Sequence, residues 1–166
     1  MKKIVLLIVT VIMGLSANAQ QSGFTAGVHT GLPVGDYKFG FSVNFGLDIA
    51  YLWSVSDSFS LGVTTGYTHY VGKDVNNSYY GSSYRFDDGG FVPVAVSYRV
   101  AITDFLFAGT DLGYARYILE GGGGGFYFQP KLGYSMEKID VFASYKGIVS
   151  NGTNLATIGV GAAYKF

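Results

Sequence analysis

Large apolar side chains alternate with small or polar ones throughout Phe39-Gly40-Phe41-Ser42-Val43-Asn44-Phe45-Gly46-Leu47-Asp48-Ile49-Ala50-Tyr51. Every odd-numbered position is aromatic or aliphatic, and every even-numbered position is Gly, Ser, Asn, Asp or Ala. Successive side chains of a β-strand point to opposite faces, so this period of two predicts a strand with one apolar and one polar face. Phe41 is expected on the apolar face and Ser42 on the polar face.

The same alternation recurs along the chain, and no stretch shows a sustained helical period. Turn residues separate the alternating segments, and eight such segments can be drawn. We therefore predict an all-β chain. The predicted strands are 22–29, 39–51, 59–70, 91–100, 105–117, 125–135, 139–148 and 156–166.

Connections between the predicted strands alternate in length. Those at 52–58, 101–104 and 136–138 are short. Short turns at one end and longer loops at the other are typical of transmembrane β-barrels. An even strand number places both termini at the short-turn end, which is periplasmic in such barrels. The other connections are mostly longer and rich in Gly, Asn, Ser and Asp: 30–38, 71–90, 118–124 and 149–155.

The two predicted faces differ in kind. On this assignment the apolar face carries no charged residue and essentially no glycine, whereas the polar face carries both. A soluble sandwich would favour Lys, Glu and Thr on its water-facing side, where glycine would weaken the strands. Small residues fit inside a narrow barrel, so we expect the polar face to line the lumen and the apolar face to meet lipid. The charged residues of the polar face are Asp48, Arg99, Asp111, Lys131, Asp140, Lys146 and Lys165.

Composition agrees with a membrane barrel and excludes several other classes. Of the 166 residues, 13% are charged and 17% are aromatic, which fits neither an ordinary soluble domain nor a disordered chain. The aromatic residues gather near both ends of the predicted strands, as interfacial girdles do. A formal net charge of zero gives no basic footprint for nucleic acid. Without cysteine there is no disulfide, thiolate metal site or cysteine nucleophile.

The first residues have the pattern of a secretory signal peptide. Lys2 and Lys3 precede the apolar segment 4–15, and Ala17 and Ala19 occupy the positions that a signal peptidase reads. The apolar core is too short for a comfortable membrane-spanning helix. We therefore expect residues 1–19 to be a cleaved signal peptide and residues 20–166 to form the barrel.

Two prolines interrupt the expected regularity. Pro93 and Pro130 fall within the predicted strands 91–100 and 125–135. Proline has no backbone N–H to donate, and a closed barrel has no free edge to accommodate that loss. We expect a bulge or a local break at each.

These features resemble the small eight-stranded outer-membrane β-barrel family (OmpA/OmpX-like), in the single-domain form common in Bacteroidetes. The resemblance is carried by the signal peptide, the alternation and the ending Ile158-Gly159-Val160-Gly161-Ala162-Ala163-Tyr164-Lys165-Phe166. It implies an up-and-down antiparallel transmembrane barrel in a Gram-negative outer membrane. It also implies recognition of the last strand, ending at Phe166, by the barrel-assembly machinery. We expect a monomer surrounded by outer-membrane lipid.

The width of such a barrel limits what it can conduct. Eight strands leave an interior that side chains just fill, and Phe91, Phe107, Tyr127 and Phe142 are expected to point inward. Asp111 and Lys131 lie on neighbouring strands, as do Asp140 and Lys165, so paired charges are expected. We interpret the inward charges as a structural network without a wide pore, and a proton or ion path is the alternative.

The favoured function is therefore a structural or cell-surface interaction role in the outer membrane. Segment 71–90 is the longest loop, and its Tyr, Ser, Gly and Asn are suited to adaptable recognition, so a ligand- or partner-binding barrel is the second hypothesis. The sequence does not identify the ligand or partner.

A lipid A-modifying enzyme is the third hypothesis. His29 and His69 are expected near the outer strand ends, with carboxylates and hydroxyls in the loops nearby. No local motif joins these residues, so we predict no catalytic residue, no cofactor and no metal site. The carboxylates and hydroxyls are Asp36, Asp74, Ser78, Ser82 and Ser83.

Overall fold

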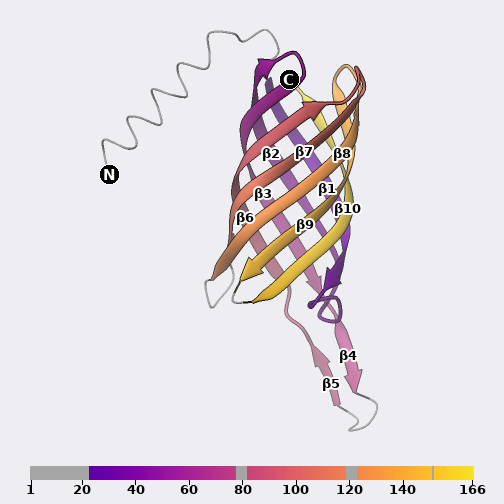
Figure 1. The fold of residues 1–166 in the computed structure, drawn as a ribbon. Coiled ribbons are helices and arrows are strands. Elements are labelled where there is room, and N and C mark those ends of the chain that lie inside the picture. Colours follow the sequence, from indigo (N-terminus) through magenta and orange to yellow (C-terminus); the bar gives the residue numbers. More distant parts are fainter. Residues whose placement is uncertain (1–22, 78–81, 119–122, 151) are drawn as a thin grey trace, which may run out of the picture.

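A computed structural model describes residues 23–77, 82–118, 123–150 and 152–166. In these residues eight antiparallel strands close into a barrel, in the order β1-β10-β9-β8-β7-β6-β3-β2 (Figure 1). The predicted signal peptide, 1–19, lies outside the described residues. In the described part of the chain, no helix is long and apolar enough to cross a membrane.

Each predicted segment corresponds to one barrel strand, and most strands are longer than predicted. The first is extended most, from the predicted end at residue 29 to Gly35. The strands are β1 (Gly23–Gly35), β2 (Phe41–Ser56), β3 (Phe59–Gly72), β6 (Gly89–Ala101), β7 (Leu106–Tyr117), β8 (Gly124–Ser135), β9 (Ile139–Ser150) and β10 (Thr153–Lys165).

The predicted loop 71–90 contains a further hairpin. Its strands are β4 (Asp74–Asn77) and β5 (Ser82–Arg85), which pair only with each other. The hairpin projects beyond the barrel at the end opposite the C-terminus (Figure 1). The barrel thus has short turns at one end and its longest connection at the other, as predicted. The predicted loops 30–38 and 149–155 were wrong in extent, because β1 runs to Gly35, β9 ends at Ser150 and β10 begins at Thr153.

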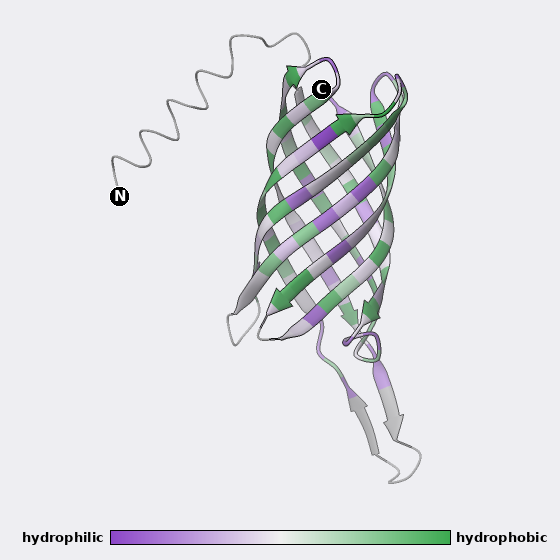
Figure 2. Ribbon diagram, viewed as in Figure 1, coloured by the Kyte–Doolittle hydropathy of each residue, from purple (hydrophilic) through white to green (hydrophobic). Residues whose placement is uncertain are grey.

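The polar face lines the lumen and the apolar face points outward. In β2, Asn44 is buried, whereas Phe45, Leu47 and Ile49 are 43–59% exposed. Green and purple or pale residues alternate along the strands in Figure 2. The predicted inward aromatics also lie inside, because Phe107, Tyr127 and Phe142 are buried and Phe91 packs against the buried cluster.

The alternation fails at the start of β2, where our assignment of Phe41 and Ser42 was wrong. The pairing with β3 shifts register between Phe41 and Val43. A bulge of this kind changes the face to which the preceding side chain points. Phe41 therefore packs inward on Tyr70, with 5.5 Å between ring centroids, and Ser42 is exposed.

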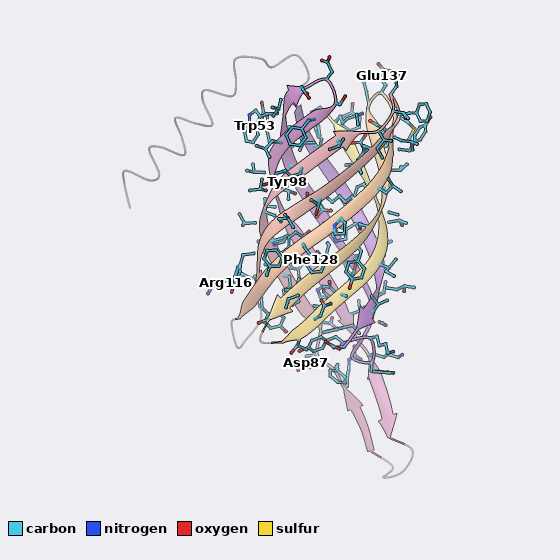
Figure 3. All side chains as sticks on the ribbon, viewed as in Figure 1. Trp53, Asp87, Tyr98, Arg116, Phe128 and Glu137 are labelled. Carbon is cyan, nitrogen blue, oxygen red and sulfur yellow. The ribbon has the colours of Figure 1, made fainter. Side chains whose placement is uncertain are left out.

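The outward face is also less uniform than predicted. Arg116 lies near the end of β7, and in this strand the even-numbered residues face outward. Figure 3 shows its side chain pointing away from the barrel. It is the one Asp, Glu, Lys or Arg on the outward face of the described barrel strands, so the expectation of an uncharged apolar face was wrong at this position. A strand end is where an arginine can extend its charge out of the apolar zone.

Both prolines break the strand pairing on one side, as predicted. Pairing of β3 with β6 is interrupted between Thr65↔Val94 and Thr68↔Phe91, opposite Pro93. Pairing of β8 with β9 is interrupted around Pro130, between Phe128↔Gly147 and Lys131↔Ser144. The register is the same before and after each gap, so each is a local break and not a bulge.

Inward glycines allow the walls and the lumen side chains to approach closely. A Cβ atom at Gly46 would lie 2.6 Å from Nε2 of His29 and closer still to the carbonyl oxygen of Tyr67. At Gly23, by contrast, the nearest atom to such a Cβ would be 3.7 Å away. Glycine is therefore required by the packing at position 46 and not at position 23.

The glycine requirement gives a first testable prediction. Gly46→Ala should lower the free energy of unfolding by about 1–3 kcal/mol, the usual cost of overpacking a close-packed interior. Gly23→Ala is the matched control and should have little effect. Urea titration of both variants in lipid vesicles measures the difference. Equal stability of the two variants would contradict the close packing around Gly46.

Candidate functional site

The half of the lumen nearer the β4–β5 hairpin is filled by an apolar cluster. Its buried members come from β3, β6, β7, β8, β9 and β10, and Phe41 and Phe91 pack against it. Tyr70 and Tyr127 are almost fully buried. The hydroxyl groups of Tyr70 and Thr157 are 3.2 Å apart, and Asn44 donates to Thr157 at 2.8 Å. The cluster consists of Tyr70, Ala95, Ala115, Tyr127, Ile148 and Leu155.

A buried polar network lies next to this cluster. Nδ1 of His29 is 2.6 Å from Oδ2 of Asp48, and Nζ of Lys146 is 2.8 Å from Nε2 of His29. Lys146 also donates to Thr68 at 2.9 Å. An ionised carboxylate only accepts hydrogen bonds, so this network assigns the imidazole proton to Nδ1 and leaves Nε2 to accept from the lysine. Four strands are joined by these contacts.

Ion pairs occupy the half of the lumen nearer the short turns. Lys131 and Asp111 are 2.5 Å apart, and Lys165 and Asp140 are 3.2 Å apart, so both predicted pairs form. Arg99 of β6 also pairs with Asp140 of β9. The Arg99 contact was not predicted, because β6 and β9 are not neighbours in the sheet and strand adjacency gives no signal for it.

His29 does not lie at the outer rim as predicted. Because β1 continues to Gly35, His29 is in the middle of its strand and is buried in the lumen. Its carboxylate partner is Asp48, not a loop residue. The error came from ending the first strand at residue 29, whereas β1 continues to Gly35.

His69 does lie near the end of β3 that leads to the hairpin, but on the outward face of the wall. Its ring contacts Phe45, with 5.2 Å between centroids. Nε2 of His69 is 3.2 Å from Oδ2 of Asp88, and the hydroxyl of Tyr67 is 3.1 Å from Nδ1. The carboxylate accepts from Nε2, so Nδ1 of the neutral ring accepts from the tyrosine. His29 and His69 therefore lie on opposite sides of the barrel wall and cannot serve one catalytic site.

The other residues of the enzyme hypothesis are dispersed. Oδ2 of Asp36 accepts a hydrogen bond from the backbone N–H of Asn154 at 3.0 Å. Asp74 begins β4, while Ser82 and Ser83 belong to β5, and Ser78 lies outside the described residues. Among the residues that the structure describes, no group of three or more His, Cys, Asp or Glu side chains is placed to hold a metal ion.

The β4–β5 hairpin is attached firmly at its base. The N–H of Lys73 donates to the carbonyl of Gly40 at 2.9 Å, and the N–H of Phe86 donates to the carbonyl of Lys73 at 3.1 Å. Asp88 accepts from the N–H of Gly72 at 2.9 Å. The hairpin is thus a structured extension of the barrel.

Sequence comparison identifies no relative, whereas structural comparison does. No protein-family model matches the chain, and no curated protein matches it. Ail, the attachment invasion locus protein of Yersinia pestis, is similar in its crystal structure, with a TM-score of 0.56 and 15% identity over 87% of this chain and 97% of that chain. Its structure in a phospholipid bilayer nanodisc gives a TM-score of 0.56 and 14% identity over 86% and 99% of the two chains.

A de novo designed transmembrane β-barrel is also similar. It has a TM-score of 0.52 and 14% identity, over 87% of this chain and 95% of that chain. Identities this low concern the fold alone. The predicted fold class is confirmed: the described chain has the fold of the small eight-stranded outer-membrane β-barrels.

The lumen ion pair gives a second prediction. Asp111→Asn leaves Lys131 without its carboxylate and should cost about 3–5 kcal/mol of unfolding free energy, as expected when one partner of a buried pair is removed. The double variant Asp111→Leu/Lys131→Met removes both charges and should lose much less. Urea titration compares the two, and a single variant as stable as the double one would contradict the pairing.

The hairpin base gives a third prediction, on pH. The Gly72 hydrogen bond, with a smaller contribution from the His69 bond, holds the pKa of Asp88 below its ordinary value of 3.8. A lowered carboxyl pKa stabilises the folded form above the ordinary value, and this contribution is lost as pH falls through the lowered one. The Gly72 amide resonance should therefore titrate with a midpoint below 3.8. Asp88→Asn should abolish this titration, and a midpoint above 3.8 in the unmodified protein would contradict it.

Proposed function

We propose that this chain is an integral protein of the bacterial outer membrane, with a structural or cell-surface role and no wide pore. The observation that carries the proposal is the inverted arrangement of the barrel. Large apolar side chains such as Leu47, Val94 and Leu132 are 59%, 67% and 59% exposed on the outside, while charged and polar groups are buried inside. Such an exterior is compatible with the hydrocarbon core of a lipid bilayer, and a closed sheet leaves no backbone group unpaired at an edge.

Aromatic side chains near both barrel ends support this placement. At the short-turn end Tyr51 contacts Trp53, and Phe166 contacts both Phe24 and Tyr164, with 5.0–5.6 Å between ring centroids. Exposed aromatics near the other end are Phe39, Phe45, Tyr67, Tyr114 and Phe126. Two such groups fit two membrane interfaces. We place the short-turn end and both termini in the periplasm and the hairpin at the cell surface.

The last strand and the closure of the sheet bear on assembly and oligomeric state. Strand β10 ends at Lys165, and Phe166 is 74% exposed, so the last strand offers an accessible terminal aromatic to the barrel-assembly machinery. All eight described barrel strands are paired on both sides within one chain. The fold is therefore complete as a monomer surrounded by lipid.

A surface partner binding the β4–β5 hairpin is the second candidate, because the hairpin extends beyond the barrel (Figure 1). Ail has been solved in complex with the heparin analogue sucrose octasulfate. The charges around the hairpin here do not favour binding of a polyanion, because segment 71–90 contains two cationic and three carboxylate side chains. These are Lys73, Arg85, Asp74, Asp87 and Asp88.

Lipid A modification is the weaker candidate. His29 is enclosed in the lumen, so His69 with Tyr67 and Asp88 is the arrangement that faces the membrane. Unchanged lipid A in a His69→Gln strain would remove this candidate.

A fourth prediction tests the membrane placement. Leu47→Arg places a charge on the outer surface of the barrel at the middle of β2. It should cost about 2–4 kcal/mol of folding free energy in bilayers. Ser42→Arg, near the hairpin end of the same strand, should cost only about 0–1 kcal/mol. Urea titration in vesicles gives both values. The unmodified protein should fractionate with the outer membrane and change its gel mobility on boiling.

The outcome that would contradict the proposal is a soluble, periplasmic protein with no such mobility shift. Replacing residues 74–85 by a short turn is the matched test of the surface role. This variant should insert like the unmodified protein, because the hairpin strands pair only with each other. Any loss of surface attachment in this variant would then be caused by removal of the hairpin and not by a defect of the barrel.

A further inference from the structure

The lumen contains a vestibule that opens at the short-turn end. Its volume is about 850 Å³, and its walls come from β1, β2, β3, β6, β7, β8 and β10 together with the short turns. A narrower space of about 70 Å³ continues inward to the Asp111–Lys131 pair. Beyond that pair lie the His29 network and the apolar cluster around Tyr70 and Tyr127. The vestibule is therefore a blind pocket and not one mouth of a channel.

The floor of the vestibule carries an excess positive charge. Arg99 and Lys165 both pair with Asp140, so two cations share one carboxylate. The three side chains are 21%, 29% and 4% exposed, which means that the cations and not the carboxylate face the open space. Lys131 and Asp111, deeper in, balance each other.

Arg99 has donors to spare, and its position is held. Lys165 uses its three protons on Oγ of Ser135, the carbonyl of Met136 and Asp140. In the described chain, Arg99 directs one N–H to Asp140 and has no other protein acceptor. Its guanidinium lies 3.7 Å from the centroid of the Phe107 ring. A planar guanidinium with free N–H groups is suited to binding a carboxylate or phosphate through two parallel hydrogen bonds.

The rim of the vestibule has the opposite charge. Each of the three short turns contributes one carboxylate to the lining, from Asp57, Asp104 and Glu137. Figure 3 shows Glu137 at this end of the barrel. No ion pair to these carboxylates is present within the described residues. A simple anion would have to pass three negative charges to reach Arg99. A molecule that also carries an ammonium group would be attracted both by the rim carboxylates and by the positive floor.

We propose that the vestibule binds a small zwitterion, with its oxyanion on the Arg99 guanidinium and its ammonium group among the rim carboxylates. Hydroxyl groups around the walls suit a hydrophilic linker between the two charges. The chemistry is that of an amino acid, a short peptide or a phosphoethanolamine group. The hydroxyl residues are Thr25, Ser54, Ser58, Ser60, Thr103 and Ser135.

The test is an NMR titration of the folded, isotope-labelled protein in nanodiscs that lack phosphatidylethanolamine. The probes are phosphorylethanolamine and glycylglycine as zwitterions, with inorganic phosphate and ethanolamine as the single-charge controls. Both zwitterions should shift vestibule resonances saturably, at lower concentration than either control. The zwitterion that binds more tightly indicates whether the site prefers a phosphate or a carboxylate as its oxyanion. No saturable shift with either zwitterion, or phosphate alone binding as tightly, would overturn the proposal.

Three variants assign the binding to the two charge levels. Arg99→Gln should weaken zwitterion binding about tenfold or more, as expected for a lost charged hydrogen-bond donor. Arg116→Gln, which alters an arginine on the outer wall, should leave binding unchanged. The triple variant Asp57→Asn/Asp104→Asn/Glu137→Gln changes only turn residues and should erase the preference for zwitterions over phosphate. Unchanged preference in the triple variant, or equal binding in Arg99→Gln and Arg116→Gln, would overturn the proposal.

If Arg99→Gln does not fold, Arg99→Lys serves in its place. Lysine keeps the charge beside Asp140 but lacks the planar pair of donors. Zwitterion binding should still weaken, and unchanged affinity would overturn the role given to the guanidinium. Because the titration uses purified folded protein, its result is independent of where the protein resides in the cell.

Discussion

Closure of the sheet is the constraint on which the other features of this protein depend. Strand β1 pairs with β10 from Thr25↔Lys165 to Gly35↔Leu155, so the first and last strands complete the ring. A closed sheet satisfies its backbone hydrogen bonds internally, which permits an apolar exterior without exposing polar backbone to lipid. The same closure makes the inward face of the sheet concave, so side chains from opposite walls must share a narrow lumen.

That shared space explains the unusual composition of the interior. Glycine at positions such as 46 and 161 leaves room for His29 and Phe142, whose rings would collide with any added Cβ atom. The charged groups are tolerated there because they meet partners on neighbouring strands or across the lumen. Arg99 and Asp140 come from strands that are not neighbours, and the four-residue network of His29, Asp48, Lys146 and Thr68 joins four strands.

The lumen is consequently divided along its length. Tyr70, Tyr127 and their neighbours fill the half nearer the hairpin, while the half nearer the short turns is open and polar. This division argues against transport through the barrel and directs attention to its two ends. One end carries a projecting hairpin, and the other carries a blind vestibule with a positive floor and a negative rim.

Local chain geometry explains how much of this protein could be predicted from its sequence. The period of two depends only on successive side chains pointing to opposite faces, so it located the barrel strands and assigned Asn44, Asp48, Asp111 and Lys131 to the lumen. Neighbouring strands are adjacent in sequence here, so the Asp111–Lys131 and Asp140–Lys165 pairs could be predicted as well.

Features that depend on tertiary structure could not be predicted in this way. The bulge that turns Phe41 inward and Ser42 outward arises from the register with β3. The depth of His29 depends on how far β1 continues against β10, and the Arg99–Asp140 pair depends on the curvature that brings distant strands together. Alternation indicates which face a residue occupies, but only the closed barrel determines its height in the lumen and the residue opposite it, because both follow from the pairing of all strands at once.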